Sequence, residues 1–373
     1  MPRSRGGGRG VIEKGVFDAY AYCAPRTTPF ATHIGHCAMT LRHGLRICLR
    51  PTFILPVLLA AALLVLAFNL GNLGNVLGRI QALSIATLSF ALAMGLCYLL
   101  LKLWQLHLLL ADLDLHPGWR RLCLAFAVGE LSLTLPFGVF AQNWILSRHR
   151  PVHFGRSSAA TVVMLLVEAL AVLVFLAVVG VPGWPELAPL AAAFAIGLLV
   201  LVAVALRLEP FARRLVQRVR QPVMHRILVE ALELLLGLKR LSNPRVLIVN
   251  VAIAVLYLAA LTLAFTAVGH GVGLPHLSYL AAASIYAFSL AVLLICGGLV
   301  SQIGTLEILG MGAALAWGFS FTDGLALMFG FRIVWTGVMW LLNLPVVVFL
   351  WRTLLATPTS VDNLEEAPHG TSL

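Results

Sequence analysis

Long apolar runs separated by short basic segments cover most of this chain. An apolar helix needs about 20 residues to cross the hydrocarbon core of a bilayer. Runs long enough for one crossing lie at 53–70, 83–103, 157–180, 188–207, 246–268 and 324–351. This pattern predicts an all-α, polytopic membrane helix bundle rather than an aqueous domain.

Two further apolar stretches, 122–146 and 278–319, are interrupted by acids, glycines and other polar or helix-breaking residues. Such groups are tolerated at membrane depth only where protein or a water-filled cavity satisfies them. Because the two breaks lie at corresponding places in two halves of the chain, they indicate a transport site. The substrate-path candidates in the breaks are Glu130, Pro136, Gly138, Gly298, Ser301, Gln302, Gly304, Thr305 and Glu307.

Composition and charge narrow the class. Of 373 residues, 60% are hydrophobic and 11% charged, and the mean hydropathy is +0.96, which excludes an ordinary soluble domain. The net charge of +11 comes from basic residues between the apolar runs, so it indicates cytoplasmic loops and anionic lipids rather than nucleic acid. The six cysteines form no CxxC pair, and neither an ATP-binding loop nor a zinc-protease motif occurs. We therefore expect no metal, no cofactor and no enzymatic activity.

The basic residues also predict the orientation of the spans, because cytoplasmic loops are enriched in Lys and Arg. Flanks assigned to the inside are Arg42, Arg46 and Arg50 before the first run, Lys102, Arg120 and Arg121 after the second, and Arg148, Arg150 and Arg156 before the third. The loops 181–187 and 269–277 carry no Lys or Arg and are assigned to the outside. Both termini are then cytoplasmic.

This orientation turns each interrupted stretch into a hairpin that enters and returns on one side of the membrane. The 122–146 stretch would enter from the cytoplasm and the 278–319 stretch from the outer face, as an inverted repeat requires. The predicted halves are 51–208 and 246–352, joined by a cytoplasmic linker, 209–245, which Pro222 divides into two amphipathic pieces. Residues 1–50 are expected to form a disordered basic leader, with Met39 as an alternative start, and 353–373 a disordered tail.

The acids in the apolar stretches each allow two interpretations. Glu130 belongs either to a polar substrate path or to a structural pair with Arg120 or Arg121, or it reaches the inner surface. Glu168 lies mid-span with Thr161 and Leu165 on its helical face, and would either couple transport to protons or form a structural pair with Arg332.

Glu307 either lines a cavity or stabilises a helix start at Gly304 and Thr305. Arg332 lies well inside the last run, and is a counter-ion for Glu307 or Glu168 or a clamp for lipid phosphate. The basic loop that contains Arg148, Arg150 and Arg156 either attracts anionic headgroups or is solvated positive-inside charge.

The chain resembles the flippase-like membrane region of the lysylphosphatidylglycerol synthases. The resemblance rests on Leu135-Pro136-Phe137-Gly138 followed by Arg148, and on Gly297-Gly298 to Gly304-x-x-Glu307 followed by Gly318 and Arg332. It implies movement of a phospholipid or another lipid-linked substrate between leaflets of the bacterial inner membrane, with the broken helices lining the route. Lipid-modifying members carry a cytosolic aminoacyl-transfer domain after this region, and lysyl transfer is not expected here.

The function expected from these observations is lipid translocation, or an accessory role in lipid export. One alternative is an intramembrane lipid-modifying transferase that uses Glu130 or Glu307 as a general base. Another is a non-catalytic membrane partner that holds a lipid-synthesis enzyme at the inner surface through 209–241. The lipid, the direction, the energy source and the oligomeric state, a homo-oligomer included, stay open.

Overall fold

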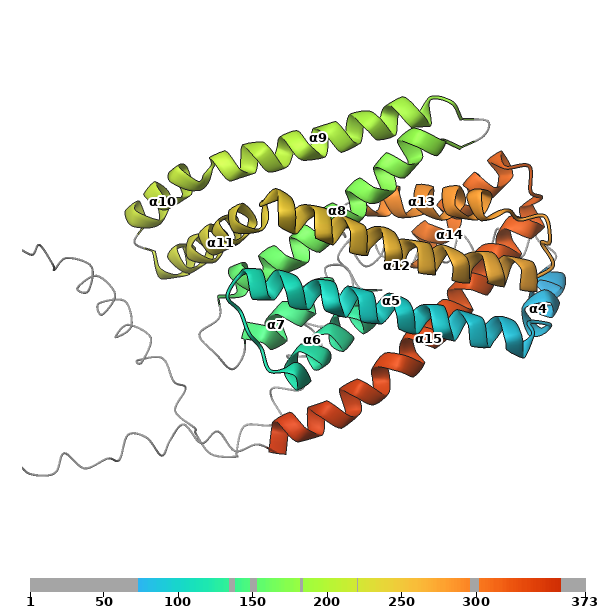
Figure 1. Cartoon of the computed structure of the whole chain (residues 1–373), viewed down its shortest axis with the longest axis horizontal. Helices are drawn as coiled ribbons and strands as arrows, with labels where there is room; N and C mark the ends of the chain where they lie inside the picture. The colour runs from blue at the N-terminus through green and yellow to red at the C-terminus, as the bar shows by residue number, and fades with distance from the viewer. Residues whose placement is uncertain are drawn as a thin grey trace, which may run out of the picture. The chain divides into compact units, whose positions relative to one another are not determined.

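The computed structural model describes residues 73–133, 138–147, 153–181, 184–219, 221–295 and 302–356 (Figure 1). Within these ranges the chain forms twelve α-helices and one short 3-10 helix, with no strand, which confirms the all-α prediction. The elements in order are α4 Leu73–Gln81, α5 Ile85–Asp112, α6 Trp119–Ser132, η1 Gly138–Phe140, α7 Ala141–Ser147, α8 Phe154–Val179, α9 Leu187–Arg207, α10 Glu209–Arg218, α11 Pro222–Leu241, α12 Pro244–Gly271, α13 Tyr279–Ile295, α14 Gln302–Ala316 and α15 Phe321–Ala356.

Five helices, α5, α8, α9, α12 and α15, are long and apolar enough to cross a membrane. They correspond to five of the six predicted crossings. The sixth prediction, 53–70, lies outside the described residues, as does the leader 1–50. Of the predicted tail, 357–373 lie outside them too, whereas α15 continues to Ala356, past its predicted end at 351.

Local chemistry marks several helix starts. The Ser84 hydroxyl accepts the Thr87 N–H at 3.1 Å before α5, and Asn243 accepts the Arg245 N–H at 3.1 Å before α12. Proline occupies the first position of α11, where its missing N–H has no helical partner to lose. The predicted division of the linker at Pro222 is therefore confirmed: α10 precedes it and α11 starts with it.

The long helices pack around one interior. Helices α5 and α12 run side by side (Figure 1), α8 contacts both, and α15 contacts α5, α6 and α12. An aromatic row fills the contact between α12 and α15, where the rings of Phe265 and Phe331 meet edge to face with centroids 4.9 Å apart. Phe331 in turn stacks on Trp335 at 5.5 Å. These rings form an apolar wall beside the polar groups described below.

Each interrupted stretch forms a pair of short helices in contact, α6 with α7 and α13 with α14. Helices α6, α13 and α14 have 14, 17 and 15 residues, or roughly 21 to 26 Å at 1.5 Å per residue. These lengths fall short of the hydrocarbon thickness of about 30 Å. The 278–319 stretch thus contains two short helices, α13 and α14.

The assignment of Lys102 to an inner basic flank is wrong. Helix α5 continues to Asp112, so Lys102 lies inside the helix, and only 6% of the residue is exposed. The predicted run ended at 103 because the residues after it include Gln105 and His107, which lower its hydropathy. In the structure Gln105 is buried and donates from its side-chain amide to the Asn250 carbonyl on α12 at 3.2 Å. Gln105 therefore faces a neighbouring helix, and α5 extends past it.

Helix α11 packs closely on the first half of α8. A Cβ on Gly155 would lie 1.9 Å from the Glu230 carbonyl oxygen, and one on Gly237 would lie 2.6 Å from the Ala159 Cβ, so glycine is required at both positions. The Glu230 carboxylate accepts the Gly155 N–H at 2.6 Å, where it complements the positive end of the α8 dipole. The linker helix is thus attached to the bundle.

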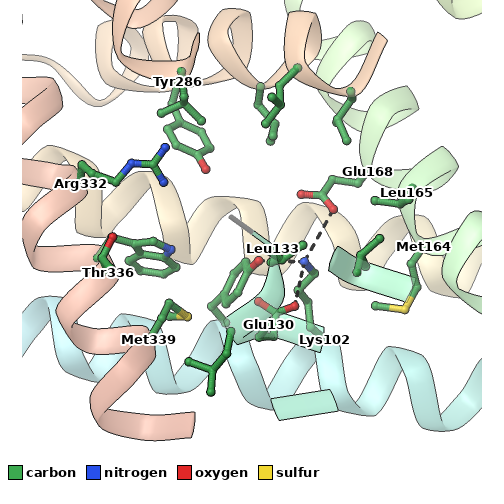
Figure 2. A pocket seen from close by; sticks show the side chains of 18 of the residues that line it. Lys102, Glu130, Leu133, Met164, Leu165, Glu168, Tyr286, Arg332, Thr336 and Met339 are labelled. Carbon is green, nitrogen blue, oxygen red and sulfur yellow. Dashed lines mark hydrogen bonds and ion pairs between the residues drawn. The ribbon is translucent and has the colours of Figure 1, made fainter. Parts of the chain in front are cut away.

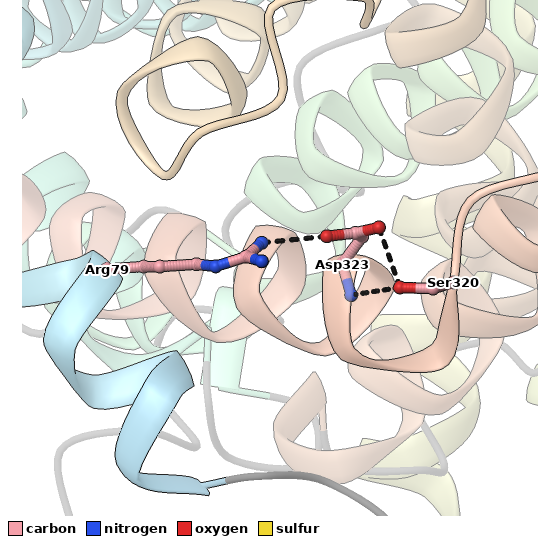
Figure 3. A network of polar contacts seen from close by, with 3 residues as sticks. All are labelled: Arg79, Ser320 and Asp323. Carbon is pink, nitrogen blue, oxygen red and sulfur yellow. Dashed lines mark hydrogen bonds and ion pairs between the residues drawn. The ribbon is translucent and has the colours of Figure 1, made fainter.

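At the other end of the bundle, an ion pair joins α4 to the start of α15 (Figure 3). The Arg79 guanidinium lies 2.7 Å from the Asp323 carboxylate. Ser320 caps the start of α15, since its hydroxyl accepts the Asp323 N–H at 3.2 Å and donates to the Asp323 carboxylate at 2.6 Å. Asp323 therefore starts α15 and holds α4 at the same time.

Candidate functional site

A cavity in the helix bundle is lined by residues of α5, α6, α8, α13, α14 and α15, together with Val139 of η1 and Gln142 of α7. Its empty volume is about 1160 Å³, including the space at its open side. Both interrupted stretches contribute, the first through Glu130 and Leu131 and the second through Leu290 and Leu306. The structure thus brings the two breaks to one cavity.

A cluster of three charged side chains, Lys102, Glu130 and Glu168, forms one polar side of this cavity (Figure 2). The Lys102 Nζ lies 3.4 Å from Glu130 Oε1 and 3.8 Å from Glu168 Oε2. The three side chains come from α5, α6 and α8, and each is at most 8% exposed. Below, this set is called the lysine cluster. Burying a single charge would be costly, so the pairing is what allows these groups inside the bundle.

Two tyrosines hold the ammonium of the lysine cluster. Lys102 donates to the Tyr98 hydroxyl at 2.8 Å, one helical turn earlier on α5. Its Nζ also lies 4.9 Å from the Tyr98 ring centroid and 5.5 Å from that of Tyr257 on α12. The rings of Tyr98 and Tyr257 meet edge to face at 5.5 Å. Cation–π contacts of this kind favour the charged form of the lysine at a site with little water.

A second ion pair joins Arg332 on α15 to Glu307 on α14. Arg332 lines the cavity, and Figure 2 shows its guanidinium beside the Tyr286 side chain. The other Glu307 oxygen accepts the Gly304 N–H at 2.8 Å, and Gly304 has a φ of 87°, which favours glycine. Glu307 therefore stabilises the start of α14 and also pairs with Arg332. The predicted counter-ion relationship between Arg332 and Glu307 is confirmed.

Two of the structural pairings considered for the acids are wrong. Glu168 pairs with Lys102 and not with Arg332, because α5 packs on α8 and brings the lysine to it. Glu130 does not reach the inner surface or pair with Arg120 or Arg121, since it is buried and contacts Lys102. Arg121 instead donates to the Ile145 carbonyl at 3.4 Å.

The predicted shared face of α8 is present, because Thr161, Leu165 and Glu168 all line the cavity. Thr161 also holds α7 in place: its hydroxyl accepts from Gln142 at 2.7 Å and from Asn143 at 2.9 Å. A Cβ on Gly129 would lie 3.0 Å from the Gln142 amide oxygen, so α6 and α7 approach closely here. This network positions the first interrupted stretch against α8.

Gly138 belongs to the first break, and its place in the structure explains why the residue is small. A Cβ there would lie 1.6 Å from the Ser132 carbonyl oxygen at the end of α6.

Thr305 is partly buried and does not line the cavity. Arg156 belongs to the first turn of α8 and donates to the Leu113 carbonyl at 2.8 Å, so it stabilises a loop. Candidates outside the described residues are Pro136, Arg148, Arg150, Gly298 and Ser301, and the Gln302 side chain is not described either.

Polar cavity residues missed from the sequence include Tyr98, Lys102, Gln142, Tyr286 and Thr336. The Tyr-x-x-x-Lys spacing at 98 and 102 places both side chains on one face of a helix, and this pattern was available in the sequence. Among the described residues, no group of three or more His, Cys, Asp or Glu residues is arranged to hold a metal ion. The charged and hydrogen-bonding side chains of the lining could bind a charged or polar group.

A helical bundle with five membrane-length apolar helices and charged groups around an interior cavity defines a multi-pass membrane protein. The model of the lysylphosphatidylglycerol synthase TM region matches residues 53–356, so the chain belongs to this family. The match covers the described helices and confirms the resemblance seen in the sequence. No curated protein and no solved structure matches the chain.

Proposed function

We propose that this protein translocates an anionic phospholipid, or another lipid-linked substrate, between the leaflets of the bacterial inner membrane. The family membership supports a function related to membrane lipids. The observation that carries the proposal is the cavity itself, in which Arg332 and the lysine cluster face one space built from both interrupted stretches. Buried charges in a membrane bundle typically mark a substrate path.

The lining of the cavity suits a lipid headgroup. Arg332 presents a guanidinium, whose fork of donors matches phosphate oxygens, and Figure 2 shows the Tyr286 hydroxyl close by. Apolar side chains cover much of the remaining lining, among them Met164, Leu165 and Leu290. A headgroup would contact the charged groups, while the acyl or isoprenoid chain would follow the apolar part.

The short helices support a transport route through the bundle. Since α6 and α14 are too short to cross, each interrupted stretch would enter and return on one side, in the inverted arrangement expected from the charged loops. Two such hairpins would meet at one cavity. Movement of each half would then open this cavity in turn to one leaflet and to the other. In this proposal both termini are cytoplasmic.

The experiment is a headgroup-exposure assay in vesicles that contain the purified protein. We expect Arg332→Gln to slow translocation of an anionic phospholipid at least tenfold, because the guanidinium in the cavity is lost. Arg79→Gln is the matched control, since Arg79 pairs with Asp323 away from the cavity. Wild-type rates in both folded variants, or no translocation by the wild-type protein, would refute the proposal.

A second candidate function is the docking of a lipid-synthesis enzyme on α10 and α11. Large apolar side chains are exposed there, with Phe211 at 62%, Val223 at 67% and Ile227 at 57%. Arginines such as Arg214 and Arg218 lie beside them. Stable co-purification of such an enzyme, lost in Phe211→Ser, would support this role, provided that translocation does not respond to Arg332→Gln.

A further inference from the structure

We propose that the lysine cluster binds one exchangeable proton, and that this proton crosses the membrane together with the anionic headgroup. The inference rests on the proposed function, and it assigns an energy source to the same cavity. Its basis is the geometry of Lys102, Glu130 and Glu168, in which one ammonium lies within 4 Å of two carboxylates.

The net charge of the lysine cluster depends on whether both of its acids are ionised. One ammonium neutralises one carboxylate, so the cluster carries one excess negative charge when both acids are ionised. The Arg332 and Glu307 pair contributes zero, because the two charges cancel. Within the part of the chain that the structure describes, no cation other than Lys102 lies within ion-pair distance of Glu130 or Glu168. An uncompensated buried charge is costly, and one proton bound by the cluster as a whole restores neutrality.

Three tyrosines and one arginine on the surrounding helices also face the lysine cluster. Tyr98 on α5 and Tyr257 on α12 pack on the ammonium. Tyr286 on α13 and Arg332 on α15 face the cluster across the cavity (Figure 2). Arg332 is paired with Glu307 on α14 and thus does not supply the missing counter-charge. The tyrosines are neutral hydrogen-bonding groups, so they leave the charge count unchanged.

A proton and a lipid headgroup would reach the lysine cluster through the same cavity. Glu130, Glu168 and Arg332 line the same cavity, so a proton and a lipid phosphate would enter one space. An anionic headgroup near Arg332 would meet the excess negative charge of the unprotonated cluster, and at low dielectric this repulsion is strong. Protonation of either carboxylate removes the excess charge. Headgroup binding and proton binding therefore favour each other, which is the requirement for moving both in one step.

The distances allow the cluster to change partners. The Lys102 Nζ makes its short contact, 2.8 Å, with the Tyr98 hydroxyl, whereas both carboxylates lie beyond normal hydrogen-bond distance. A small movement of α6 or α8 would tighten one carboxylate contact and release the other. The released carboxylate takes up the proton from water on one side and gives it back to water on the other side after the headgroup has left.

The test uses vesicles containing the full-length protein and a fluorescent anionic phospholipid, with the membrane potential held at zero. With one proton per lipid, a gradient of one pH unit should produce about a tenfold difference in lipid between leaflets at steady state. Glu130→Gln and Glu168→Gln each leave one lysine and one carboxylate, so in either variant the distribution of lipid between leaflets should not follow the pH gradient, whatever the rate of translocation. Asp323→Asn, the same kind of change at the Arg79 pair, should respond like the wild type.

The outcomes separate the two proposals. If wild-type protein translocates lipid at equal rates with and without the gradient, the proton inference is wrong and the proposed function stands. If the wild-type protein translocates nothing, the proposed function fails, and infrared spectra at neutral pH decide the proton inference. A protonated-carboxyl band that disappears in both glutamine variants would support it, and the absence of that band from the wild-type protein would overturn it.

Discussion

The Lys102 ammonium lies 3.4 Å from the Glu130 carboxylate, although these residues belong to different helices and neither is at the surface. Glu130 lies in the first interrupted stretch and Lys102 in a long apolar helix. This contact attaches the break to the bundle interior. It also explains why an acid is stable at this depth, since a buried carboxylate needs a partner or a proton.

Removing the cation of this pair should destabilise the protein. Lys102→Met leaves two buried carboxylates without a counter-charge, and breaking a buried ion pair costs about 3 to 5 kcal/mol. Thermal unfolding in detergent should show a clearly lower midpoint. Lys239→Met is the control, because the Lys239 side chain is 63% exposed and should matter little. Equal midpoints for the two variants would contradict the importance of the lysine cluster.

Gly138→Ala should disrupt the first interrupted stretch. Its Cβ would lie 1.6 Å from the Ser132 carbonyl oxygen, so the turn between α6 and η1 must move. We expect lower thermal stability and loss of lipid translocation. Gly197→Ala on α9 is the control, since a Cβ there meets nothing within 4 Å and alanine favours a helix by about 1 kcal/mol. Equal thermal stability and equal lipid translocation in the two alanine variants would contradict this prediction.

Thr161→Val should release α7 from α8. The change removes the acceptor of the Gln142 and Asn143 amides, and each unpaired buried donor costs about 1 to 3 kcal/mol. Hydrogen exchange in α7 should become faster. Thr266→Val on α12 is the matched control, because the Thr266 hydroxyl donates within its own helix, to the Thr262 carbonyl at 2.8 Å. Unchanged exchange in α7 would show that Thr161 does not hold this helix.

The loop after α5 should respond to acid. The hydrogen bond from Arg240 lowers the pKa of the Asp114 carboxyl below its ordinary value of 3.8, and Arg156 acts in the same direction. A lowered native pKa means that this contact stabilises the fold above about pH 4, and that the contribution is lost as the pH falls through the native pKa. Thermal midpoints below pH 4 should therefore drop more for the wild type than for Asp114→Asn.

Asparagine is a suitable replacement at this position because Asp114 has a φ of 57°, a conformation that asparagine also tolerates. The Asp114→Asn protein should keep the fold of the loop while losing the pH-dependent part of its stability. Parallel acid profiles for wild type and variant would show that the Asp114 to Arg240 contact contributes nothing to the pH dependence.

Hydrophobic runs alone were sufficient to predict the five long helices and the division of the linker at Pro222. The Arg332 and Glu307 pair was also among the predictions, because few cations lie far inside an apolar run. Lys102 was missed since it was grouped with the basic residues that follow the second run, whereas α5 continues past it to Asp112. The partner of Glu168 depends on which helix packs on α8, and hydropathy carries no information about that choice.

Photo-crosslinking is the most direct test of whether a lipid headgroup passes through the cavity. An anionic phospholipid with a photoreactive headgroup would be incorporated with the protein into vesicles, and the crosslinked residues identified by mass spectrometry. The account predicts crosslinks at cavity residues such as Leu165 and Thr336, and their loss in Arg332→Gln. Crosslinks confined to exposed faces such as that of α9, with Leu165 and Thr336 unmodified, would contradict it.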